Sequence, residues 1–255
     1  MRRLLPILLL LLWSWSATAQ FDFPVLGARN GSMGGCSTAL DDLGAAPTNV
    51  AAWAWQSRAA LGMSIRNTAL LKQLSYGNLQ LCLPTQRHGS FALTMDHFGT
   101  AAYYEQRTSL AYALAFHRLA LGVRLDYLHS GTSHPLIDPL HRLSFAAGLQ
   151  ARITDRLLLG LRTTGGTSYN LGLSYLMADG LQGTTELEYQ QQLRLRAGLE
   201  YGWQQTLFAR IGIATRPAMY TFGLGYQLRH CHFDMTLQVV QPIGCSSMLS
   251  IHYIF

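Results

Sequence analysis

The sequence is poor in charged residues. Only 13% of its 255 residues are Asp, Glu, Lys or Arg, whereas a soluble domain usually carries about 25%. Lys72 is the single lysine, and the 18 arginines are scattered without forming a basic block. This composition argues against an ordinary cytosolic enzyme, a disordered tail and a nucleic-acid-binding protein.

Long hydrophobic runs are also missing after the N-terminus. The mean hydropathy is only +0.13, and no stretch beyond residue 20 is long and apolar enough for a membrane-spanning helix. At the N-terminus, Arg2 and Arg3 precede an apolar run from Leu4 to Trp13 and an Ala17-Thr18-Ala19 cleavage site. We interpret residues 1–19 as a cleaved signal peptide. Its removal takes away Arg2 and Arg3 and lowers the net charge from +6 to +4. The basic pI is therefore no argument for an anionic partner.

The remaining sequence alternates with period two. Leu119, Leu121, Val123, Leu125 and Tyr127 are interleaved with small or charged residues, and the same pattern recurs along the chain. Successive side chains of a strand point to opposite faces, so each segment has one apolar and one polar face. The pattern predicts about fourteen strands (12–14), at 58–66, 73–84, 88–97, 102–117, 119–130, 141–152, 156–164, 168–178, 182–190, 193–203, 206–215, 218–228, 231–240 and 246–255.

Alternation alone does not separate a soluble barrel from a transmembrane one, but the turns do. The turns after even-numbered strands are all short, and the longest connection, Ser130 to Leu140, follows an odd-numbered strand. Short periplasmic turns and longer extracellular loops are typical of outer-membrane barrels. We therefore predict an all-β fold, a transmembrane antiparallel β-barrel of a Gram-negative outer membrane.

The C-terminus fits this prediction. The last predicted strand ends with Tyr253 and Phe255 on one face. It resembles the C-terminus of outer-membrane barrels, in which a terminal aromatic residue preceded by another two positions earlier is the signal read by the barrel-insertion machinery. Outer-membrane lipid and that machinery are therefore the first expected partners.

Residues 24–56 do not alternate, and their motifs resemble those of FadL-like outer-membrane barrels, including PorV/PorQ-type proteins of the Bacteroidetes. The resemblance is carried by Gly27-Ala28-Arg29, Met33-Gly34-Gly35, Ala39, Asp41-Asp42 and Asn49-Val50-Ala51-Ala52. Two departures stand out, because Cys36 replaces the usual alanine and Val50 the usual proline.

The resemblance implies that residues 20–56 fold into the lumen as a hatch, with 57–255 forming the barrel. The expected hatch residues are Arg29, Met33, Gly34, Gly35, Asp41, Asp42 and Asn49. An ordinary N-terminal cap without a gating role is the alternative. The family includes transporters of hydrophobic small molecules, which is the first functional hypothesis. The alternative is an accessory or anchor component of a type IX protein-secretion system, which would bind secretion proteins.

Charged residues recur on the polar faces of the strands. The candidates for the lumen are Arg124, Asp126, Arg162, Arg194, Arg196, Glu200, Arg210 and Asp234. They would bind an anionic or amphipathic ligand, or form a salt-bridge network that fills a narrow barrel and holds the hatch. The second reading is favoured, because small barrels fill their interiors with side chains.

No residue pattern predicts catalysis, a metal site or a cofactor. The Gly-Thr-Ser-His stretch at 131–134 has no nucleophile context, and Cys231 faces away from His230 and His232 on a strand. We therefore expect a protein that is not an enzyme and binds no nucleic acid. Cys36, Cys82, Cys231 and Cys245 allow three disulfide pairings between which the sequence does not choose, although Cys36 and Cys82 could meet.

Overall fold

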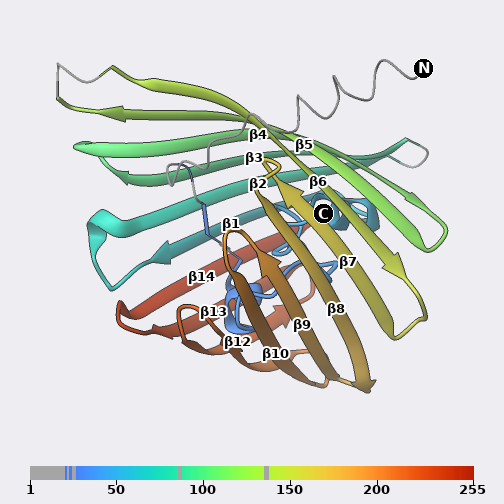
Figure 1. Cartoon of the computed structure of the whole chain (residues 1–255). Helices are drawn as coiled ribbons and strands as arrows, with labels where there is room; N and C mark the ends of the chain where they lie inside the picture. The colour runs from blue at the N-terminus through green and yellow to red at the C-terminus, as the bar shows by residue number, and fades with distance from the viewer. Residues whose placement is uncertain (1–20, 22, 25–26, 86–87, 135–137) are drawn as a thin grey trace.

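The structure, a computed structural model, describes residues 21, 23–24, 27–85, 88–134 and 138–255. Fourteen antiparallel strands form a closed barrel in which each strand pairs with its sequence neighbours and β1 pairs with β14 (Figure 1). This confirms the predicted fold class and the upper strand count. The predicted signal peptide lies outside the described residues. The strands are β1 (Ala60–Asn67), β2 (Ser75–Thr85), β3 (Gly89–Thr100), β4 (Tyr103–Phe116), β5 (Leu119–Thr132), β6 (Leu140–Arg152), β7 (Leu157–Thr164), β8 (Ser168–Ala178), β9 (Leu181–Tyr189), β10 (Leu193–Trp203), β11 (Leu207–Ala214), β12 (Met219–Leu228), β13 (Cys231–Val240) and β14 (Gly244–Ile254).

The two faces of each strand differ as the alternation requires. On β5, the outward side chains of Val123 and Leu125 are 59% and 55% exposed, while the inward Arg124 and Asp126 are 4% and 1% exposed. An apolar band this large would be unfavourable in water. A barrel with apolar residues outside and polar residues inside is built to stand in a lipid bilayer.

Exposed tyrosines and a tryptophan gather toward both ends of the barrel. At one end they are Tyr103, Tyr127, Tyr169, Tyr189 and Tyr220, and at the other end Tyr175, Tyr201, Trp203, Tyr226 and Tyr253. Tyrosine and tryptophan have an apolar ring and a polar tip, which suits the boundary between lipid and water. The two groups therefore mark the height of the apolar band.

The two ends differ in turn length. Turns after even-numbered strands have at most four residues, whereas those after odd-numbered strands reach seven at 68–74 and 133–139. We call these the short-turn end and the long-turn end. The longest connection is shorter than the eleven-residue span expected from Ser130 to Leu140, because the β5–β6 ladder continues to Ser130 opposite Leu140 and β5 itself to Thr132.

Residues 27–56, which precede β1, run through the inside of the barrel. They include a short helix, α2 (Ala28–Ser32), and a 3-10 helix, η1 (Val50–Trp55), both visible as the blue segment within the strands in Figure 1. The fully buried Trp53 of η1 packs among inward alanines of β3, β4 and β6. Among the described residues, no helix has the length and apolar character needed to span a membrane.

Candidate functional site: a lumen divided by the N-terminal segment

Seven inward-facing glycines make room for residues 27–56, which we call the N-terminal segment. A Cβ atom added to any of them would stand 2.0–2.8 Å from an atom of the segment. On β11, for example, it would lie 2.0 Å from the amide nitrogen of Gly34. The barrel wall is thus shaped to receive the segment's backbone. These residues, which we call the glycine belt, are Gly122, Gly148, Gly160, Gly172, Gly198, Gly212 and Gly223.

Side chains of the wall also satisfy the segment's peptide groups. Gln150 donates hydrogen bonds to the carbonyls of Thr38 (3.0 Å) and Leu40 (2.8 Å). Gln238 donates to the Gly31 carbonyl at 2.9 Å, and Thr236 donates to that of Ala28. Buried peptide groups need such partners wherever regular secondary structure is absent. The segment is therefore held along most of its length by the barrel.

Glu186 on β9 is the strongest of these attachments, and the sequence did not single it out. Its Oε2 accepts hydrogen bonds from the amides of Ser37 (2.7 Å) and Thr38 (2.8 Å). Its Oε1 lies 3.3 Å from Arg196 NH1 and 3.5 Å from Arg162 NH2. The sequence does contain a signal for Glu186, because Glu186 and Glu188 fall on the polar face of the alternating segment 182–190.

Arg29 links the segment to β10, the strand next to β9. It pairs with Asp42 of the segment at 2.5 Å and forms a bidentate contact with Glu200 at 2.7 and 2.8 Å. Glu200 in turn contacts Arg210, which also pairs with Asp234, each at 2.5 Å. Burial alone lowers the pKa of Arg29, but the carboxylates of Glu200 and Asp42 raise it well above its ordinary value. Arg29 thus remains a charged tie between segment and wall.

Most of the other candidate lumen residues contact the segment as well. Arg124 pairs with Asp126 at 2.6 Å and donates to the Pro47 carbonyl. Arg162 donates to Thr38 Oγ1 and Arg196 to the Gly35 carbonyl, each at 3.0 Å. Arg194 lies 3.8 Å from Glu188 and donates to the Thr215 carbonyl at 3.1 Å. These charges are largely engaged in holding the structure together.

The remaining predicted hatch residues lie within the segment's own framework. Asn49 caps η1 by accepting from the Ala51 amide at 3.2 Å, and it donates to the Thr38 carbonyl at 2.6 Å. Met33 is fully buried, next to the belt glycine of β10. Asp41 differs from the others, because its ion pair with Arg152 at 2.9 Å is about two-fifths exposed at the short-turn end.

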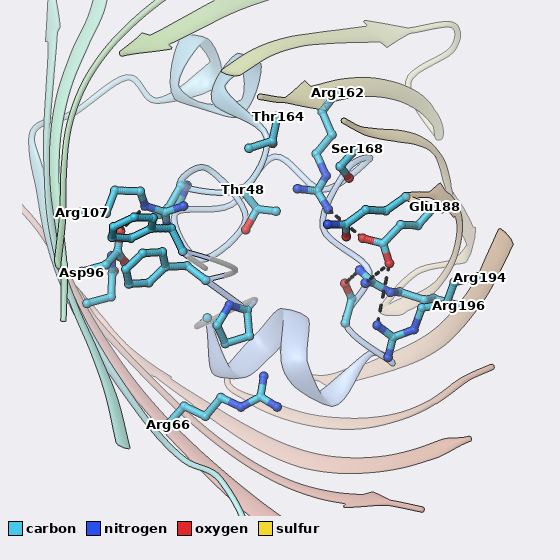
Figure 2. A pocket seen from close by; sticks show the side chains of 18 of the residues that line it. Thr48, Arg66, Asp96, Arg107, Arg162, Thr164, Ser168, Glu188, Arg194 and Arg196 are labelled. Carbon is cyan, nitrogen blue, oxygen red and sulfur yellow. Dashed lines mark hydrogen bonds and ion pairs between the residues drawn. The ribbon is translucent and has the colours of Figure 1, made fainter. Parts of the chain in front are cut away.

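A cavity of about 400 Å³ opens on one side of the segment, toward the long-turn end (Figure 2). We call it the arginine cavity, since seven arginines line it against two carboxylates, Asp96 and Glu188. Its apolar lining includes Phe21, Phe23 and Ile243. The arginines are Arg66, Arg107, Arg124, Arg142, Arg162, Arg194 and Arg196. In the described part of the chain, Arg66 Nε is buried without a hydrogen-bond partner.

A second cavity of about 280 Å³ lies toward the short-turn end. We call it the histidine cavity, because His232 and His252 face each other across β13 and β14 in its lining. Its other charged lining residues are Arg29, Asp42, Glu200, Arg210 and Asp234, and apolar groups come from Leu43, Phe208, Tyr226 and Ile254. Two arginines and three carboxylates line the histidine cavity, so it lacks the excess of arginine found in the arginine cavity.

The cysteines do not pair. Cys36, Cys82, Cys231 and Cys245 are all free, so the possible meeting of Cys36 with Cys82 is wrong. Cys82 packs in the alanine-rich cluster around Trp53, whereas Cys36 lies near Glu186 and Arg196 on the other side of the lumen. Burial raises the pKa of the Cys36 thiol, and the charge of Glu186 adds to this effect. Within the described ranges, no cluster of His, Cys, Asp and Glu could hold a metal ion.

Comparisons with known proteins give similarity in structure but not in sequence. No protein-family profile and no curated protein sequence matches the chain. The toluene transporter TbuX of Ralstonia pickettii superposes with a TM-score of 0.70 at 12% identity, over 92% of this chain and all of that one. A FadL homologue of Pseudomonas aeruginosa gives 0.69 at 13% identity, over 91% and 98%.

The Pseudomonas putida toluene transporter TodX gives a TM-score of 0.66 at 12% identity, over 92% of this chain and 98% of that one. At sequence identities of 12–13%, the similarity shows a shared fold and nothing about function. Together with the fourteen-stranded closed barrel, this similarity shows that the chain has the fold of the FadL-type barrels.

Proposed function

We propose that the chain is an outer-membrane channel for hydrophobic small molecules. The observation that carries the proposal is the division of the lumen, within a barrel of apolar exterior, into two cavities by the inward-folded N-terminal segment. The fold is shared with proteins described as toluene transporters and monoaromatic hydrocarbon channels. The predicted signal peptide and the apolar exterior support a location in the outer membrane of a Gram-negative bacterium.

The arginine cavity is the proposed capture site. Its position at the long-turn end places it on the extracellular side, if longer loops face outward as is typical. Its aromatic and aliphatic lining suits an apolar body, and its excess of arginine favours a ligand with a negative head group. The ligand then passes the N-terminal segment into the histidine cavity and leaves toward the periplasm or through the wall.

An uptake measurement tests this function. The full chain is produced in a Gram-negative host that lacks its own channel for hydrophobic compounds, and entry of radiolabelled toluene and of a long-chain carboxylate is followed. Uptake above that of the same host making an unrelated barrel is expected for at least one probe. Equal uptake of both probes in the two hosts would refute the function. No specific observation favours the type IX secretion role, which stays a prediction.

A further inference from the structure

Gly44 borders both cavities. It belongs to the lining of the arginine cavity and to that of the histidine cavity, on opposite sides of the N-terminal segment. A Cβ at Gly44 would stand 2.8 Å from Asn30 Oδ1, 2.9 Å from Asp42 Oδ1 and 3.7 Å from His252 Cε1 of β14. The two cavities therefore come closest where the segment has no side chain and faces β14.

Residues 42–46 have fewer hydrogen bonds to the wall than residues 28–40. Between Ala28 and Leu40, wall groups bind the backbone repeatedly, and the glycine belt encloses residues 32–34 and 38–39. In the described part of the chain, one hydrogen bond ties 42–46 to the wall, from Gln80 to the Leu43 carbonyl at 3.1 Å. Its other hydrogen bonds stay within the segment, where Asp42 pairs with Arg29 and accepts from the amides of Gly44 (2.7 Å) and Ala45 (3.1 Å), and the Ala45 carbonyl accepts from the amides of Thr48 and Asn49. Leu43 and Ala46 also pack in the cluster around Trp53.

We infer that the ligand crosses the segment at Gly44, and that this residue sets the size of what passes. The inference rests on the proposed function. Residues 42–46 move aside as a small loop when the Arg29–Asp42 pair separates, while residues 28–40 stay in place. Moving residues 42–46 withdraws Leu43 and Ala46 from the cluster around Trp53, whereas moving the belt-bound part would break many buried hydrogen bonds at once.

A graded substitution series at Gly44 tests the inference. In the uptake assay above, G44A is expected to reduce uptake several-fold and G44V at least tenfold, with a larger reduction for a larger probe such as naphthalene than for toluene. Gly77→Val is the matched control, because a Cβ there meets nothing within 4 Å and Gly77 lines neither cavity. The heat-dependent electrophoretic mobility of each variant establishes that its barrel has formed.

The series distinguishes failure of the proposed channel function from failure of the proposed passage at Gly44. If the parent chain takes up no probe, the proposed function fails. If the parent takes up probe and a folded G44V chain does so equally well, the function stands and the passage at Gly44 is overturned. A uniform reduction by G77V and G44V would equally overturn it, because the effect would then lie in the wall.

Hydrogen exchange of the unmodified protein provides a second test that needs no variant to fold. Amides of residues 42–48 are expected to exchange at least tenfold faster than those of residues 31–38. Equal protection of the two stretches would mean that the segment moves as one body or not at all, and would overturn the assignment of the moving part.

Discussion

The carboxylate of Glu186 accepts a hydrogen bond from the amide of Ser37 at 2.7 Å, which joins the middle of strand β9 to the N-terminal segment. The same carboxylate pairs with Arg162 and Arg196, which Glu188 also contacts, so one buried side chain binds both the segment's backbone and two arginines of the wall. Loss of the negative charge at Glu186 would therefore weaken contacts within the wall and contacts between the wall and the segment.

Replacing Glu186 with Gln should destabilise the folded protein. Arg162 and Arg196 lose one of the two carboxylates with which they pair and keep Glu188. Removal of one partner from a buried pair costs about 3 to 5 kcal/mol in the free energy of unfolding. Denaturant unfolding in detergent measures the change. Asp155→Asn, which removes an exposed ion pair with Arg118, should have little effect. Equal stability of the two variants would contradict the anchoring role of Glu186.

Replacing Gly160 of the glycine belt with Val should displace the N-terminal segment. Its Cβ would stand 2.0 Å from the Thr38 carbonyl oxygen, so the segment must move or the barrel must deform. We expect faster proteolysis within residues 27–56 and a larger conductance in planar bilayers. Gly77→Val has room for its side chain and should behave like the parent. A parent-like proteolysis pattern for G160V would show that the close approach is not a constraint.

Asp42→Asn should make the barrel leakier. The variant loses the ion pair with Arg29, which we propose keeps residues 42–46 closed. Liposome swelling with small sugars should show a permeability increase of several-fold. Asp41→Asn is the matched control, since it removes a neighbouring carboxylate whose ion pair with Arg152 is about two-fifths exposed. If both variants leak to the same degree, the Arg29–Asp42 pair has no special part in closure.

Thiol labelling should distinguish the cysteines. Cys245 is exposed, whereas Cys36 is buried and its thiol pKa is raised. A raised pKa leaves the thiol protonated at pH 8, and the thiolate is the reactive form. Maleimide at pH 8 should therefore modify Cys245 in the folded protein and reach Cys36 only after denaturation. Mass spectrometry of tryptic peptides gives the readout, and rapid labelling of Cys36 would mean that the segment leaves the lumen frequently.

Arg66→Gln should separate charged from neutral ligands. Its side chain lines the arginine cavity, so its positive charge lies close to a ligand bound there. Uptake of a long-chain carboxylate should fall about tenfold, which corresponds to the loss of one charge-assisted contact. Toluene uptake should be unchanged. An equal fall for both probes would indicate a structural role for Arg66.

The strands could be predicted because period two is a direct consequence of strand geometry. Apolar residues such as Leu121 and Val123 repeat at every second position over enough segments to fix the barrel and its strand count within two. The path of residues 27–56 was expected only through resemblance, since a stretch without periodicity carries no signal for what it packs against.

The glycine belt and Glu186 lay beyond prediction for a different reason. Gly160 and Gly212 occupy the inward register, where any small or polar residue satisfies the alternation, so their need for close backbone approach is invisible without the segment beside them. The lumen charges were found, but their partners were not, because Arg29 and Glu200 are far apart in sequence and meet only when the segment is inside.

The enclosure of the N-terminal segment constrains the order of assembly. The described chain begins in the arginine cavity and joins β1 at the other end, and its ties come from strands as distant as β2, β9 and β14. A folded barrel would have to be threaded from end to end to receive it. Pairing of β1 with β14, which brings Phe255 to the Ala59 carbonyl, is therefore the step that traps the segment. We therefore expect the N-terminal segment to lie between the strands before β1 pairs with β14.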